Sequence, residues 1–159
     1  MLKDIKLTND PLLPEMIREI TIAPPDDSVD LPAITITGAY LKRDTFRAIL
    51  KPIMGKQELD DRDETKYRSA VVQRSWRGWS GVTLRNLARV SEYVLLNYEA
   101  LKEAFAGRDA DENTPIAFDI EDAKWVATKL NNETFVKLVE ELCRMDAYAA
   151  ERLAQEKKD

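Results

Sequence analysis

Aromatic and cationic side chains gather in one short segment of the chain. Its members are Arg74, Trp76, Arg77, Trp79, Arg85 and Arg89. Aromatic rings interleaved with arginine can stack on the bases of single-stranded nucleic acid. Trp and Arg are also the residue types that most often anchor a protein interface. In a third interpretation the indole rings belong to the core and the guanidinium groups lie over their faces.

The charge of the whole chain helps to rank these three interpretations. The 159 residues include 24 Lys and Arg against 29 Asp and Glu, so the net charge is −5 and opposes a broad phosphate-binding surface. We therefore place core packing first, contact with a protein partner second and contact with nucleic acid last. The residues of this segment expected to contact a partner are Trp76, Arg77, Trp79, Arg85 and Arg89.

The residue types needed for the common kinds of catalysis are missing. The chain has no histidine, which removes Ser-His and Cys-His nucleophile pairs and the usual general base near neutral pH. The run Gly78-Trp79-Ser80-Gly81 resembles a nucleophile elbow, but that motif requires glycine two residues after the serine, where Val82 stands. We expect no enzymatic activity.

Acidic residues are numerous, but their spacing does not match a metal site. Asp109, Asp111 and Asn113 alternate as in the first half of a calcium loop, but Thr114 replaces the required glycine and Ile120 the bidentate glutamate. The acidic residues at positions 60, 61, 63 and 64 are expected to lie, hydrated, in the connection between two helices. With only five glycines there is also no phosphate-binding loop. We expect neither a metal nor a cofactor.

Length and composition predict one domain that spans residues 1–159. Apolar residues make up 44% of the chain and charged residues 33%, a balance typical of globular proteins. The single cysteine, Cys143, cannot form a disulfide framework. The sequence has neither the apolar block of a signal peptide near its beginning nor a run of 18 apolar residues anywhere. We expect a cytoplasmic protein outside the membrane.

The pattern of apolar residues predicts an α+β fold. In residues 1–42, which are rich in proline, β-branched residues at 20–22 and 33–40 flank the turn signal at 24–27 and predict a β-hairpin or small antiparallel sheet. Residues 43–159 are mainly helical by their three-and-four spacing. Helices are expected from residue 44 to 55, from 67 to about 78, from 93 to 107, from 120 to 130 and from about 132 to 153, with a frayed tail at 154–159.

Two of these helices carry clear start signals. Asp119 is placed to cap the helix that begins at residue 120, and Asn131 or Asn132 to cap the one that follows. The second helix continues its apolar stripe through Met145, Ala149 and Leu153 into the charged tail, where little of the chain remains to cover it. The stripe either packs on the preceding helix or docks into the groove of a partner.

Short motifs in the second half of the chain resemble small tail proteins of bacteriophages and prophages, several of which are tail assembly chaperones or accessory proteins. In that family a helix leads into a W-x-G-V segment, a proline-containing motif opens another helix, and a terminal helix follows. The matching residues here are Trp79, Gly81 and Val82, then Ile116, Phe118, Asp119 and Glu121, then Phe135, Ala149 and Lys157.

The sequence departs from the family pattern in two places. Ala117 separates Ile116 from Phe118, and a long insertion that includes the expected helix at 92–106 lies between Val82 and Pro115. The resemblance implies a cytoplasmic assembly factor that binds the tape-measure protein or unpolymerised tail subunits, without a cofactor or an enzymatic step. Two alternatives stay open: a structural component of the phage particle, and a small nucleic-acid-associated regulator that uses Arg74, Arg77, Arg85 and Arg89 on one surface.

Overall fold

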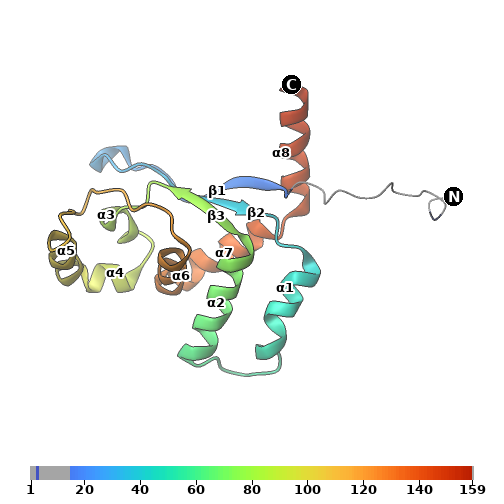
Figure 1. Ribbon diagram of the computed structural model, residues 1–159, viewed down its shortest axis with the longest axis horizontal. Coiled ribbons are helices and arrows are strands. Elements are labelled where there is room, and N and C mark those ends of the chain that lie inside the picture. Colours follow the sequence, from blue (N-terminus) through green and yellow to red (C-terminus); the bar gives the residue numbers. More distant parts are fainter. Residues whose placement is uncertain (1–2, 4–14, 159) are drawn as a thin grey trace.

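The computed structural model describes Lys3 and residues 15–158, and it has an α+β fold. Three antiparallel strands form a sheet in the order β1-β2-β3, with bounds β1 (Ile17–Ala23), β2 (Ile34–Ala39) and β3 (Trp76–Ser80). Helices α2 and α7 pack under the sheet, α3 to α5 lie at one end of the molecule, and α8 projects from the other end (Figure 1). The α+β fold with a small N-terminal sheet is therefore confirmed.

The first two strands form the hairpin that the sequence predicts. Ile34 and Ile36 of β2 are fully buried, and they alternate with half-buried threonines, as expected for a sheet covered on one face. The connection contains a short 3-10 turn, η2 (Asp27–Val29), whose start is capped by the Asp26 carboxylate, which accepts a hydrogen bond from the Ser28 N–H at 3.1 Å. The β-rich region was expected to span residues 1–42, of which residues 1–2 and 4–14 lie outside the described residues, and the first described strand begins at Ile17.

The third strand corrects the prediction of a helix that runs to about residue 78. Helix α2 (Asp61–Ser75) ends before Trp76, and the chain continues at once as β3, paired with β2 through Ile36 and Trp79. Trp76 would be buried in a helix as well as in a strand, so the apolar pattern does not distinguish the two structures at this residue. Gly81 ends β3 at a φ of +74°, and a Cβ there would lie 1.9 Å from the Ala33 carbonyl oxygen, so only glycine fits.

The helices are shorter and more numerous than the sequence predicts. Their bounds are α1 (Arg43–Leu50), the 3-10 turn η3 (Lys51–Ile53), α2 (Asp61–Ser75), α3 (Leu84–Leu87), α4 (Glu92–Leu96), α5 (Tyr98–Ala106), α6 (Ile120–Lys129), α7 (Asn132–Leu142) and α8 (Met145–Lys158). The helix expected from 93 to 107 is broken at Asn97, whose side chain donates to the Tyr93 carbonyl at 2.8 Å. The last helix is broken after Leu142, and α8 continues to Lys158 where a frayed tail was expected.

The capping predictions have different outcomes. The Asp119 carboxylate accepts hydrogen bonds from the N–H groups of Glu121 and Asp122, so it caps α6 as predicted. The Asn131 side chain makes no capping bond to α7 and instead accepts from the Glu92 N–H at 2.8 Å. Asn131 therefore ties the start of α4 to the connection between α6 and α7. Within the described residues, no helix has both the length and the apolar content needed to cross a membrane.

A buried arginine joins three of the helices. Arg68 on α2 is only 4% exposed, and its guanidinium donates to the carbonyl oxygens of Ala127 at 2.8 Å and Leu130 at 2.7 Å, at the C-terminal end of α6. It also donates to Glu64 at 2.9 Å and lies 4.6 Å from the centre of the Phe135 ring on α7. One cation thus satisfies carbonyl groups that the end of a helix leaves without partners.

Replacing this arginine is expected to destabilise the fold. Arg68→Met keeps most of the methylene packing but leaves the two α6 carbonyl groups buried and unpaired, so the free energy of unfolding should fall by about 3 kcal/mol. Urea denaturation followed by circular dichroism measures this change. Arg47→Met, at an exposed position of α1, is the matched control and should change stability by less than about 0.5 kcal/mol. A comparable loss in both variants would contradict the role given to Arg68.

Candidate functional site

Trp76, the first aromatic residue of the Trp-Arg segment, belongs to the core. Its side chain is 1% exposed, and its ring meets that of Trp79 edge-on at 6.5 Å between centroids. A partner cannot reach this ring in the folded chain. The structure therefore agrees with the core-packing interpretation for Trp76 and removes it from the predicted contact surface.

Trp79 is half-buried and connects two distant parts of the chain. Its indole N–H donates to the Ile116 carbonyl oxygen at 2.7 Å, and its ring meets Phe118 edge-on at 5.1 Å. The Ile116 N–H donates to the Val82 carbonyl at 2.9 Å, which fastens the same segment to the end of β3. The W-x-G-V segment and the proline-containing motif are thus in direct contact, and Trp79 holds them together.

The three arginines predicted to contact a partner are engaged within the chain. Arg77 pairs with Glu15, with 2.6 Å between Nη2 and Oε1. Arg85 donates to the Val29 carbonyl at 3.1 Å, and Arg89 donates to the Pro24 carbonyl. Arg85 and Arg89 therefore hold the β1–β2 connection against α3. This arrangement does not favour a free cationic surface for nucleic acid.

The apolar stripe of α8 is exposed. Met145 is 62% exposed and Leu153 58% exposed, and Ala149 between them is also exposed. Figure 1 shows α8 extending away from the rest of the molecule. Core packing, one of the two interpretations of this stripe, is therefore wrong in the described chain. These three side chains are available to another molecule.

A neighbouring face of α8 is fixed to the sheet. Tyr148 is buried, and its hydroxyl donates to the Gly38 carbonyl oxygen at 3.0 Å. Its ring lies 5.5 Å from the Tyr40 ring, and the Arg18 guanidinium lies 5.0 Å from its centre. Burial raises the pKa of Tyr148 to about 12 although Arg18 acts in the opposite direction, so the hydroxyl remains a donor at neutral pH.

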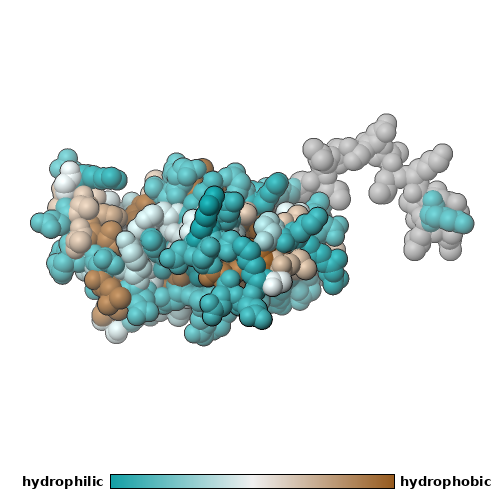
Figure 2. Space-filling view, turned by 90° about the horizontal axis from the view of Figure 1, so that it is seen from below, coloured by the Kyte–Doolittle hydropathy of each residue, from teal (hydrophilic) through white to brown (hydrophobic). Residues whose placement is uncertain are grey.

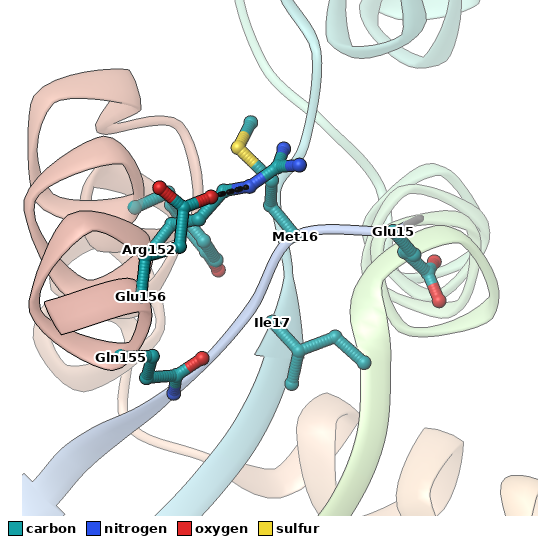
Figure 3. Close-up of a pocket in the computed structure, with 7 residues that line it drawn as sticks. Glu15, Met16, Ile17, Arg152, Gln155 and Glu156 are labelled. Atoms are coloured by element: carbon teal, nitrogen blue, oxygen red, sulfur yellow. Dashed lines mark ion pairs between the residues drawn. The ribbon is translucent and has the colours of Figure 1, made fainter. Parts of the chain in front are cut away.

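The hollow beside Tyr148 is polar on its α8 side. Arg152, Gln155 and Glu156 lie beside the beginning of β1, where Glu15, Met16 and Ile17 complete the lining (Figure 3). Arg152 and Glu156 form an ion pair at 3.5 Å, one turn apart on the helix. Beside the buried Tyr148, polar side chains of α8 thus line the hollow next to β1, while the apolar stripe is exposed to solvent.

A second exposed apolar surface lies on α4 and α6, and the sequence did not reveal it. Leu95 is 59% exposed and Leu96 75% exposed. Tyr93 is also exposed, and its ring meets that of Trp125 edge-on at 6.1 Å. The Lys129 ammonium lies 4.0 Å from the centre of the Tyr93 ring. Apolar side chains gather at this end of the molecule in Figure 2.

Trp125 also lines a groove beside this surface. The groove lies among α3, α5 and α6 and has a volume of about 410 Å³. Leu101, Phe105 and Trp125 form much of its apolar wall, and Arg108 and Asp122 contribute charges. One feature of the sequence could have indicated this region. Four apolar residues, Tyr93 to Leu96, follow one another, which is more than one face of a short helix can bury.

The acidic segments have structural roles within the described residues. The Asp111 carboxylate accepts from the Asn113 N–H at 2.8 Å, which closes a turn in the loop that resembles half a calcium site. Asp60 caps α2 by accepting from the Asp63 N–H at 2.7 Å. Lys56 bonds to the Asp63 carboxylate and lowers its pKa. No group of three acidic or cysteine residues in this part of the chain is arranged to hold a metal ion.

The comparisons with known proteins give no relative. The chain matches no family model, no curated protein and no solved structure. The candidate site is therefore defined by the contacts described above: a fixed helix with an exposed apolar stripe at one end of the molecule, and an apolar surface with a groove at the other.

The hydroxyl of Tyr148 is expected to hold α8 in place. Tyr148→Phe removes its bond and leaves the Gly38 carbonyl buried without this partner, at a cost of about 1–2 kcal/mol. Amide hydrogen exchange should become roughly tenfold faster in α8 while exchange in α2 and α6 stays unchanged. Tyr93→Phe removes an exposed hydroxyl and serves as the control. Unchanged exchange in α8 would show that ring packing alone holds the helix.

Proposed function

We propose that this protein is a non-enzymatic assembly factor that binds a protein partner through the stripe Met145, Ala149 and Leu153. The observation that carries the proposal is the orientation of α8. A helix fixed by a buried tyrosine on one side and apolar on its solvent side resembles the ligand of a helix-in-groove interface. Because Tyr148 already holds the helix, binding requires little further ordering of the chain.

The stripe has the spacing and length of the apolar residues through which a helix binds in a groove. Its members are spaced by four residues, so they lie along one side of the helix and span about 12 Å. Apolar anchors at such spacing are typical of amphipathic helices that dock into grooves. Acidic and basic residues flank the stripe on α8, which keeps the exposed apolar area narrow and limits non-specific association.

We propose further that the partner is the tape-measure protein or an unpolymerised tail subunit of a bacteriophage or prophage. The resemblance to small tail proteins suggests this partner. It gains support from the contact of Trp79 with Ile116 and Phe118, because the residues that carry the first two motifs form one packed unit. The other contact residues expected from the sequence, from Trp76 to Arg89, serve the fold in this proposal. The site of contact is α8.

An affinity capture tests the proposal. The tagged full-length protein is used to capture partners from its own host after induction of any prophage, and bound proteins are identified by mass spectrometry. The wild type should capture a tape-measure or tail-tube protein, and Leu153→Glu should reduce the yield at least about tenfold, because a carboxylate cannot enter an apolar groove without a partner. Ala154→Glu adds the same group on the opposite side of α8 and should leave the yield unchanged.

Three outcomes would contradict the proposal. Capture of metabolic enzymes only would contradict the proposal that the partner is a phage tail protein. Capture of nucleic acid that falls steeply as salt is added would favour the regulator alternative. Equal capture by the wild type and Leu153→Glu would move the contact away from α8. If the protein is also present in purified phage particles, it is a structural component that remains in the assembly.

A further inference from the structure

A groove lies between α1 and α2, separate from the two apolar surfaces described above. The two helices run side by side in opposite directions below the sheet (Figure 1). The groove has a volume of about 570 Å³, and on α2 its lining extends from Asp63 to Arg74, which is about 16 Å of helix. This length corresponds to about three helical turns, enough to seat a helix of similar length.

The floor of the groove is apolar. Ile49, Pro52 and Ile53 contribute to it from α1 and η3, and Tyr67 and Ala70 contribute from α2. The two isoleucines and the alanine are only half-buried, so part of their apolar area stays in contact with water. The small side chain of Ala70 leaves room for the backbone of another helix to approach closely. The floor therefore has the properties of a surface that a helix with an apolar face can cover.

The charged residues that line the groove are mainly basic. Lys56, Lys66 and Arg74 contribute positive charges, and Asp63 contributes a negative one. The Lys56 ammonium pairs with the Asp63 carboxylate at 2.9 Å, so these two charges offset each other. The side chains of Lys66 and Arg74 form no ion pair with another described residue. The described lining thus keeps an excess of positive charge in a chain whose net charge is −5.

The positions of Lys66 and Arg74 match those of acidic residues on a docked helix. Both are exposed, and they are eight residues apart on α2, which is about 12 Å along its axis. Acidic residues seven apart lie on one side of a helix at nearly the same separation. Two such cations are too few to hold nucleic acid against the net charge of the chain. Together with the apolar floor, they favour a helix that is both acidic and amphipathic.

We propose that the groove between α1 and α2 binds an acidic amphipathic helix of a protein partner. Lys66 and Arg74 pair with two acidic side chains of that helix, and the apolar residues between those acids pack on the floor around Ala70. The inference goes beyond the proposed function, because the groove shares no residue with the stripe on α8. The local positive charge gives an acidic partner a preferred position on a chain that is acidic as a whole.

Fluorescence anisotropy with labelled helical peptides tests the proposal on the full-length protein. An acidic peptide of four turns carries two glutamates seven residues apart beside a strip of leucine and alanine, and a basic peptide carries lysine in place of both glutamates. At about 0.15 M salt the acidic peptide should bind at least about tenfold more tightly than the basic one. The double variant Lys66→Glu/Arg74→Glu should weaken binding of the acidic peptide about tenfold. The double variant Arg43→Glu/Arg47→Glu makes the same charge change on α1 outside the groove and should bind like the wild type.

The charge-reversed protein and the basic peptide give the decisive measurement. Lys66→Glu/Arg74→Glu should bind the basic peptide more tightly than the acidic one, because both pairs are restored with their signs exchanged. No binding of the acidic peptide to the wild type, or equal affinity for the two peptides, overturns the proposal. So does a preference for the acidic peptide that persists in the charge-reversed variant, since the contact would then lie elsewhere. Circular dichroism shows whether each variant is folded.

Two further measurements test the class of the partner. An acidic peptide whose leucines are replaced by serine should bind about tenfold more weakly, and equal binding would show ionic attraction without a docked helix, which overturns the proposal. A single-stranded oligonucleotide should not displace the acidic peptide at equal concentration, and displacement would assign the groove to nucleic acid instead. Leu153→Glu leaves the groove unchanged and should bind the acidic peptide like the wild type, so the outcome here is independent of the outcome at α8.

Discussion

The fold depends on one buried cation. Arg68 is the residue through which α2, α6 and α7 meet, and the guanidinium is held by carbonyl oxygens at the end of α6 and by the ring of Phe135. A charge in the interior is tolerable only when hydrogen bonds replace its hydration, and here the end of a helix supplies them. The position of α6, and with it that of Trp125, follows from this contact. The position of α7 also follows, and α8 begins where α7 ends.

The coarse fold could be predicted from the sequence, because it depends on local patterns. Alternating Ile and Thr residues predicted β2, and the spacing of apolar residues predicted α6 and α7. The boundary at Trp76 could not be predicted. A large buried side chain is compatible with a helix and with a strand, and the strand is selected by the pairing of Trp79 with Ile36, which lies 43 residues earlier in the chain.

The Trp-Arg segment shows why residue type alone does not define a binding surface. Tryptophan and arginine contribute strongly to interfaces for the same reasons that they contribute to a fold: large contact area and several directional donors. Arg85 and Arg89 use those donors on the carbonyl groups of the β1–β2 connection, and Trp79 uses its N–H on Ile116. Such partners are tens of residues away in sequence and become visible only in three dimensions. The exposed leucines of α4 had no such prominence in the sequence, since leucine is ordinarily a core residue.

The absence of a side chain at Gly38 determines the direction in which α8 points. A Cβ at this residue would lie 2.4 Å from Leu142, the last residue of α7, and 3.4 Å from the Tyr148 hydroxyl. The Leu142 side chain therefore packs directly on the backbone of β2, and just beyond this strand the Leu142 carbonyl accepts from the Leu41 N–H at 2.9 Å. A methyl group at residue 38 would collide with the Leu142 side chain, and the displacement of Leu142 would change the direction of α8. The direction in which the stripe points away from the sheet would then change, while the residues of the stripe themselves stayed the same.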